Sequence, residues 1–159
     1  MQDSTQHIVS AFDRELEAIQ ARIMKMGGLV ENAILEGARS LDENDTELAE
    51  QVRDGDKAID ALELLINEDV TRLIALRSPT AVDLRIVLSV MKISGNLERI
   101  GDYAKNMAKR TGVLANMAPI EGGHAASAVA RRLLERIAGA SAAEIADAIA
   151  VGVGRTADR

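Results

Sequence analysis

The segment from residue 89 to residue 110 constrains the fold most, because it carries two superimposed helical repeats. Apolar residues recur at spacings of three and four, which predicts one stripe of an α-helix facing a core. Oxygen-bearing side chains recur at every fourth position on a different face. The apolar stripe consists of Ile93, Leu97, Ile100, Ala104 and Met107, and the polar ladder consists of Glu98, Asp102 and Asn106. We therefore expect an amphipathic helix whose polar ladder points away from the core.

The near absence of aromatic residues limits what the core can contain. The chain has 159 residues, which is enough for one domain with a substantial core. Apolar residues make up 47% of it, yet Phe12 and Tyr103 are its only aromatic residues. The core must therefore be built from Leu, Ile, Val, Ala and Met, as in many helix bundles. No long stretch before residue 118 reads as a strand, and the sequence predicts an all-α fold.

Two further helices precede this segment. An apolar seam from Phe12 to Gly37 alternates steps of four and three, which is typical of a long helix. Within it, Gly27 and Gly28 indicate close helix packing or a mild bend, with a functional hinge as the alternative. A second apolar stripe begins near Asp45 and ends near residues 76–77. These helices, with the third, predict an antiparallel bundle.

The helix ends are predicted from capping residues. Asn44 and Glu47 stand three apart, as in a capping box, at the start of the second helix. Ser78 followed by Pro79 reads as an N-cap with proline at the first position of the third helix. The loops between the helices are therefore short, and we assign residues 1–118 to one three-helix unit.

The sequence changes in character after this unit. Residues 113–159 contain 14 alanines and no lysine, and their five acidic residues balance five arginines. The pattern predicts two short helices, over residues 125–138 and 141–150. We therefore expect residues 119–159 to form a short Ala-rich helical C-terminal segment.

Composition also excludes several classes of function. The net charge of −6 argues against general affinity for nucleic acid. The absence of cysteine excludes disulfides and thiolate metal sites. The N-terminus is polar, and no run of about 18 apolar residues is present that could span a bilayer. The expected protein is soluble, acidic and cytoplasmic.

A second pair of carboxylates is expected at the same level along the helix axes as the polar ladder. Asp56 and Asp60 are four residues apart on the second helix. If Ser78 is the centre of the helical hairpin, equal rise along both helices places Asp56 opposite position 100 and Asp60 opposite position 96. Four carboxylates, with those of Glu98 and Asp102, should thus share one layer.

Oxygen ligands of this kind suit hard cations such as Mg²⁺, Mn²⁺, Ca²⁺ or iron. The candidate metal ligands are Asp56, Asp60, Glu98, Asp102 and Asn106. The alternative is a solvated polar face in which Lys105 and Lys109 pair with Asp102 and its neighbours. A carboxylate-bridged metalloenzyme would need Glu-x-x-His pairs that project inward, and the segment contains no histidine.

Several motifs together resemble the PhoU family. The first-helix seam from Phe12 to Gly37 and the second-helix motif GDKAID at residues 55–60 are similar to those of the family. The third-helix signature is spread over LIALRSPTAVDLR at residues 73–85, KI at residues 92–93 and LERIGDYAKN at residues 97–106. The resemblance covers about residues 7–118.

The resemblance implies properties that the spacing alone does not. Family members are built from two tandem three-helix repeats, and each repeat carries E/D-x-x-x-D motifs that bind multinuclear metal clusters on the surface. Glu98 and Asp102 match that motif, and Asp56 and Asp60 match its partner, so iron, manganese or magnesium is the implied cofactor. The implied protein is not an enzyme.

The resemblance also implies partners. The family couples the phosphate ABC transporter to a membrane sensor histidine kinase, and it represses phosphate-starvation genes when phosphate is plentiful. Such a protein would be a cytoplasmic adaptor, peripheral to the membrane only through its partners and without a nucleic-acid partner. The alternative is a metal-free helical protein-interaction module.

The chain departs from the family after residue 118. The second repeat should begin near residue 120, but residues 119–159 are short, Ala-rich and contain no E/D-x-x-x-D motif. We hypothesise a shortened, divergent or frameshifted segment. A homodimer would then cover the exposed core face that a second repeat normally covers.

Overall fold

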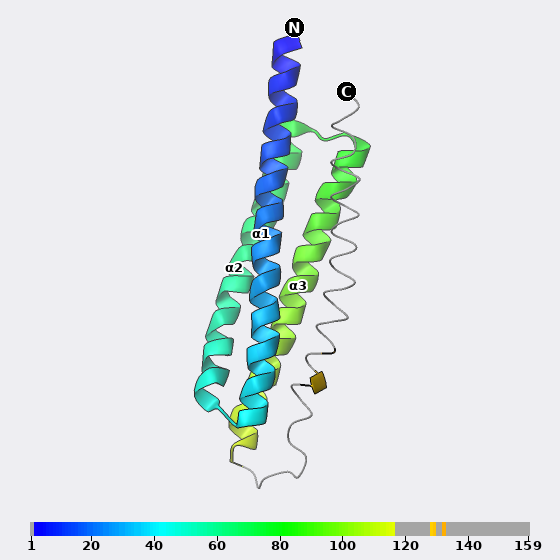
Figure 1. Cartoon of the computed structure of the whole chain (residues 1–159). Helices are drawn as coiled ribbons and strands as arrows, with labels where there is room; N and C mark the ends of the chain where they lie inside the picture. The colour runs from blue at the N-terminus through cyan, green and yellow to red at the C-terminus, as the bar shows by residue number, and fades with distance from the viewer. Residues whose placement is uncertain (1, 117–127, 130–131, 133–159) are drawn as a thin grey trace.

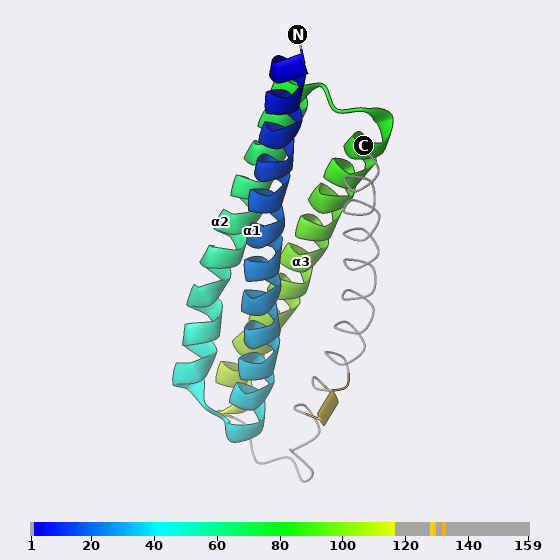
Figure 2. The same ribbon diagram turned by 45° about the horizontal axis from the view of Figure 1, so that its top comes forward.

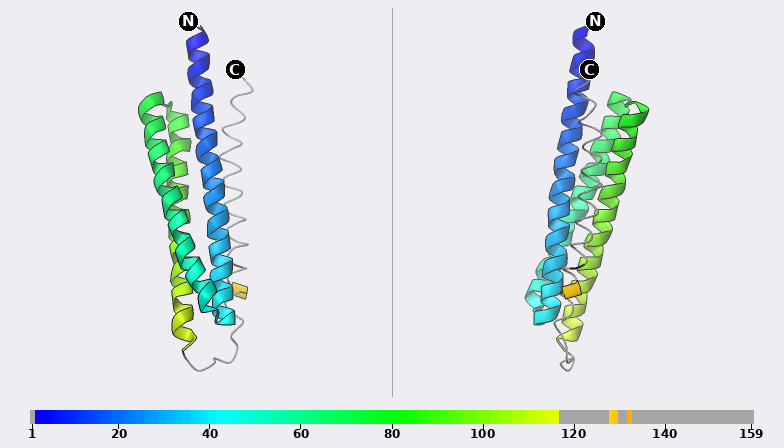
Figure 3. Two further views of the ribbon diagram at one scale, coloured as in Figure 1. Left: turned by 90° about the vertical axis from the view of Figure 1, so that its left-hand side faces the viewer. Right: turned by 45° about the vertical axis from the view of Figure 1, so that its right-hand side comes forward.

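The computed structural model describes residues 2–116, 128, 129 and 132, and these contain three long helices (Figure 1). The helices are α1 (Gln2–Glu43), α2 (Thr46–Arg77) and α3 (Ala81–Leu114). They run antiparallel to their sequence neighbours, and each packs against both of the others. The first turns of α1 extend beyond the α2–α3 connection (Figures 1 and 3). The predicted all-α three-helix bundle is thereby confirmed.

The three helices lie alongside one another (Figure 2), and a continuous apolar core lies between them. The apolar stripe of α2 is buried throughout, and Ile66 and Val70 are fully inaccessible to solvent. The stripe consists of Leu48, Val52, Ile59, Leu62, Ile66, Val70 and Leu73. On α1, Ile19, Met26 and Val30 are buried, whereas Phe12 lies at the edge of the core. Each fully buried side chain of this size contributes about 1.5–3 kcal/mol to folding. The core therefore fixes the rotation of each helix about its own axis.

The buried line of α3 differs from the predicted stripe. Ile93, Leu97 and Ile100 are only partly buried and flank the core. The buried positions are smaller and are displaced toward one side of the helix, and of the predicted stripe they include only Ala104. They are Val87, Val90, Ser94, Gly101, Ala104, Ala108 and Thr111. Small residues allow α1 and α2 to approach closely, and the larger ones then fill the edges. The helix is consequently rotated, which brings its acidic ladder closer to α2 than predicted.

The capping residue predicted for α2 is wrong by one position. Asp45 is the N-cap, and its Oδ1 accepts a hydrogen bond from the backbone N–H of Leu48 at 2.9 Å. Asn44 instead has a positive φ of 54° and closes the turn after α1. Asparagine tolerates this left-handed conformation better than most residues, which explains its place there.

The predicted start of α3 at Ser78–Pro79 is also wrong. Ser78 terminates α2 in the left-handed conformation, with a φ of 45°, and its N–H bonds to the carbonyl of Ile74. Thr80 is the N-cap of α3, and its hydroxyl bonds to the carboxylate of Asp83 at 2.6 Å. Pro79 thus lies in the loop, where its fixed φ and missing N–H cost nothing.

Close packing at Gly27 and Gly28 is not the reason for their presence. α1 continues through both residues, and a Cβ built on either would meet no atom within 4 Å. The close approach is instead at Gly37, where a Cβ would lie 3.0 Å from Cε of Met107. The helices predicted over residues 125–138 and 141–150 lie outside the described residues, apart from the helical positions 128, 129 and 132.

Candidate functional site: an acidic seam between two helices

Asp56 is the most buried carboxylate of the predicted layer, with 3% of its surface exposed. It lies on the core side of α2, where Gly101 of α3 leaves space. A Cβ at Gly101 would lie 3.7 Å from Oδ1 of Asp56 and 3.0 Å from Cδ1 of Ile59. The prediction that Asp56 faces position 100 is therefore met within one residue.

The cation that neutralises Asp56 comes from α3. Nζ of Lys105 donates a hydrogen bond to Oδ2 of Asp56, and it lies 3.5 Å from Oδ1 of Asp102. The Asp56 carboxylate holds the pKa of Lys105 above its ordinary value. A buried carboxylate is stable only when it is paired, so Lys105 fixes Asp56 in place.

The remaining carboxylates line the same junction at lower burial. Glu98 and Asp102 are half-buried, whereas Asp60 is exposed. Asn106 is also exposed, and its side-chain oxygen accepts a bond from Lys109 at 3.4 Å. We call the carboxylates along this junction the acidic seam, which consists of Asp56, Asp60, Glu63, Glu98 and Asp102.

Glu63 belongs to this seam although the sequence analysis did not single it out. It is half-buried, and its Oε1 would lie 3.8 Å from a Cβ at Gly95. Desolvation and then the charge of Asp102 raise the pKa of Glu98 most, and the charge of Glu63 adds to their effect. The signal was present in the sequence, because Glu63 follows Asp56 by two helical turns and so lies on the same face.

The electrostatics show an excess of negative charge in the seam. Partial desolvation raises the pKa of Glu98, and the charges of Asp102, Glu63 and Asp60 raise it further. The pKa of Asp60 is raised by desolvation first and then by Asp56, against the opposing effect of Lys105. One lysine thus compensates only part of the charge of five carboxylates.

The acidic seam has the oxygen donors that hard cations prefer, but it does not hold them around one point. Within residues 2–116 and the three other described positions, no group of three or more His, Cys, Asp or Glu side chains is arranged to hold a metal ion. Lys105 occupies the most enclosed carboxylate, Asp56. Lys105 also pairs with Asp102, as the alternative of a solvated polar face had predicted, whereas Lys109 bonds to Asn106.

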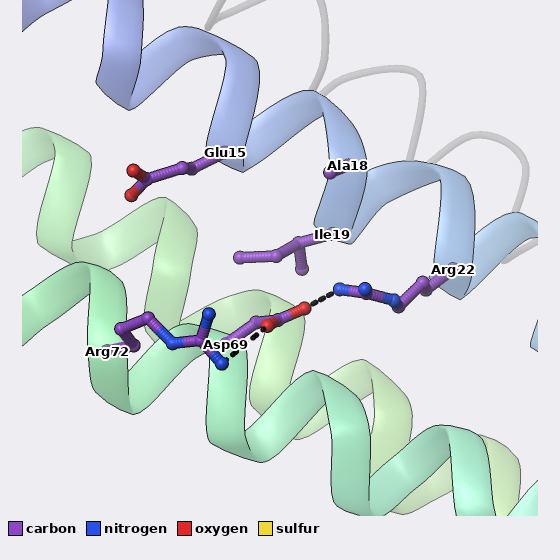
Figure 4. Close-up of a pocket in the computed structure, with 6 residues that line it drawn as sticks. All are labelled: Glu15, Ala18, Ile19, Arg22, Asp69 and Arg72. Atoms are coloured by element: carbon purple, nitrogen blue, oxygen red, sulfur yellow. Dashed lines mark ion pairs between the residues drawn. The ribbon is translucent and has the colours of Figure 1, made fainter.

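A second seam, between α1 and α2, shows the opposite charge balance (Figure 4). Asp69 of α2 pairs with Arg22 of α1 and with Arg72 on its own helix. Near it, Glu15 of α1 pairs with Arg77 of α2. Glu15, Arg22, Asp69 and Arg72 border a recess of about 180 Å³ between the two helices, and together with Arg77 they form what we call the paired seam. The bond to Arg77 lowers the pKa of Glu15, so this carboxylate is well compensated.

The fold and the acidic seam define a class of protein: a three-helix bundle with a carboxylate-rich junction on one side. The family model of the PhoU domain matches residues 23–111, which covers most of the three helices. The chain belongs to the PhoU family. None of the helices in the described part of the chain combines the length and the hydropathy that a membrane span needs.

Individual relatives match a large part of the chain. A "Phosphate-specific transport system accessory protein PhoU homolog" from Zymomonas mobilis is 49% identical over 114 residues, covering 72% of this chain and 48% of the relative. The protein called "Phosphate-specific transport system accessory protein PhoU" from Escherichia coli is 41% identical over 103 residues, covering 65% of this chain and 43% of that protein. The chain spans about half the length of the curated relatives it matches.

A solved structure shares the fold. The crystal structure of PhoU from Pseudomonas aeruginosa superposes with a TM-score of 0.76 at 34% sequence identity. The superposition covers 91% of this chain and 70% of the other. The three-helix arrangement is thus common to both proteins.

Proposed function

We propose that the chain is a cytoplasmic regulator of phosphate uptake and of phosphate-starvation signalling. The match of residues 23–111 to the PhoU domain carries this proposal, since the relatives at 40–49% identity are called phosphate-specific transport system accessory proteins. The role is that of a non-enzymatic adaptor, which acts by docking helix surfaces against the phosphate ABC transporter and a sensor histidine kinase. A homodimer would provide the second three-helix unit.

Deleting the gene for this chain from its own cell tests the regulatory role. Transcription of a phosphate-starvation reporter would be measured at high external phosphate, with a plasmid-borne copy of the chain as the control. We expect the reporter to become active in the deletion strain and to be repressed again by the plasmid. Repression that is unchanged in the deletion strain would contradict the proposal.

The second part of the proposal is that the acidic seam attracts a hard cation such as iron, manganese or magnesium. The excess of carboxylates over Lys105 supports it, and so do the raised pKa values of Asp60 and Glu98. Glu98 and Asp102 on α3, with Asp60 on α2, are the accessible donors, and Asp56 and Asn106 complete the candidate set. Because these donors do not converge in the described structure, binding requires side chains to turn toward the cation.

Elemental analysis of protein purified without chelator tests the cation site. We expect metal in the parent and its loss in Glu98→Ala/Asp102→Ala. Glu17→Ala/Glu31→Ala removes the same charge from exposed positions on α1 and should retain the metal. If the parent binds none after incubation with each cation, the chain is instead a metal-free helical interaction module. The observation favouring that second function is the bond between Lys105 and Asp56.

A further inference from the structure

The residues of α3 that are classed as exposed include several basic ones and no acidic one. Asp83, Glu98 and Asp102, the acidic residues of Ala81–Leu114, are all half-buried. The exposed positions of the same helix include five basic residues: Arg85, Lys92, Arg99, Lys109 and Arg110. This segregation is unexpected in a chain whose net charge is −6.

Four of these cations fall on one line. Arg85, Lys92 and Arg99 are seven residues apart, and Arg110 follows eleven residues later, so all four lie close to one side of the helix. Leu88 and Tyr103 lie on the same side, with 50% and 65% of their surfaces exposed. We call these six residues the basic strip.

The cations of the basic strip are not used within the bundle. No ion pair joins Arg85, Lys92, Arg99 or Arg110 to a carboxylate of the described residues. The exposed cations of α2 provide the contrast, because each of them pairs with an acid on its own helix: Arg53 with Glu50, Lys57 with Asp54 and Arg72 with Asp69. The basic strip therefore keeps its full charge for an external contact.

We propose that the basic strip docks an acidic amphipathic helix of a partner protein. Its cations would pair with carboxylates spaced about seven residues apart, and Leu88 and Tyr103 would meet apolar side chains between them. The strip is one helix wide and borders the acidic seam, so a flat anionic membrane would also meet the charges of Glu98 and Asp102. Residues 113–159 carry five acidic residues and five arginines, so as a whole this part of the chain has no net negative charge that would draw it to the strip. The proposal stands independently of the role in phosphate regulation.

A designed peptide provides the probe. It is an amphipathic helix of about 26 residues, which is the length from Arg85 to Arg110. Glu stands at every seventh position, and Leu residues lie between the Glu residues on the same face of the helix. A second peptide carries Gln in place of each Glu. Fluorescence anisotropy at low and high salt measures the binding of each peptide to the full chain. We expect the Glu peptide to bind in a salt-dependent manner and the Gln peptide to bind about tenfold more weakly or not at all.

Charge-reversed variants locate the contact. The triple variant Arg85→Glu/Lys92→Glu/Arg99→Glu should weaken binding of the Glu peptide about tenfold or more. The control Arg14→Glu/Lys25→Glu/Arg39→Glu changes the net charge equally at exposed positions on α1, and it should leave affinity within about threefold. Circular dichroism confirms that both variants are as helical as the parent.

Four results would overturn the proposal. They are no binding of the Glu peptide, equal binding of the Gln peptide, equal losses of affinity in the two triple variants, and unchanged binding of the Glu peptide to the α3 variant.

Two further measurements exclude other occupants of the basic strip. Strip-dependent binding to vesicles of phosphatidylcholine and phosphatidylserine, without peptide binding, would identify a lipid surface instead. Self-association that the α3 variant abolishes would identify a second copy of the chain.

Discussion

The two seams of the bundle both place carboxylates between helices, but the pKa values of these carboxylates shift in opposite directions. In the paired seam, arginines outnumber the carboxylates of Glu15 and Asp69, and the pKa of Glu15 is lowered. In the acidic seam, five carboxylates share Lys105, and the pKa values of Asp60 and Glu98 are raised. In the first seam each carboxylate has at least one arginine partner, and two of these ion pairs join α1 to α2. The second retains negative charge, which is what a cation-binding or docking surface requires.

Removing the central cation of each seam should show the largest difference between the two seams in their contribution to stability. Lys105→Met leaves Asp56 buried without a partner, and we expect a loss of about 2–4 kcal/mol in the free energy of unfolding. Arg22→Met in the paired seam should cost less than about 1 kcal/mol, because Arg72 still pairs with Asp69. Urea denaturation at neutral pH measures both.

A double variant completes this test. Asp56→Asn/Lys105→Met removes the unpaired charge, so it should recover more than half of the stability that Lys105→Met loses. If Lys105→Met and Arg22→Met cost the same, the two seams do not differ in the way that their geometry indicates.

A methyl group at Gly101 probes how closely α2 and α3 approach at the acidic seam. In Gly101→Ala the new Cβ would lie 3.0 Å from Cδ1 of Ile59, which must move. We expect a loss of about 1–2 kcal/mol in thermal or chemical unfolding. Gly55→Ala is the matched control on α2, where a Cβ meets nothing within 4 Å, and it should stabilise the helix by about 0.5–1 kcal/mol. Stabilisation by both variants would show that the seam is looser than described.

Neutralising one carboxylate in each seam should change stability in opposite directions. The pKa of Glu98 is raised above 4.5, so its charge opposes folding at neutral pH, and Glu98→Gln should stabilise by about 0.5 kcal/mol. The pKa of Glu15 is lowered, so its charge favours folding, and Glu15→Gln should lower the melting temperature by about 1–3 °C.

The pH dependence checks the sign of both effects. The gain from Glu98→Gln is present above the raised pKa of Glu98 and disappears as the pH falls below 4.5, where the parent carboxyl is protonated in both states. The loss from Glu15→Gln also disappears on acidification, but only as the pH passes through the lowered pKa of Glu15. Melting curves between neutral and acidic pH measure this. Two variants that shift stability in the same direction would contradict the contrast between the seams.

The sequence by itself determined the three helices and the level of the acidic residues along the bundle axis. Apolar spacing is a local property, and the rise per residue of a helix is constant, so residue numbering alone was enough to place Asp56 opposite position 100. The buried stripe of α2 was fully predicted for the same reason. The helix caps were misplaced by one or two residues, because Asn44 and Ser78 adopt left-handed conformations that close the turns.

Only the tertiary structure decided how α3 is rotated about its axis. That rotation depends on how side chains of α1 and α2 interdigitate with Gly101 and Ala104, which no local pattern contains. It brings Lys105 onto Asp56 and turns Arg85, Lys92 and Arg99 to solvent. The sequence supplied the charges, and packing decided which of them meet and which remain free for a partner.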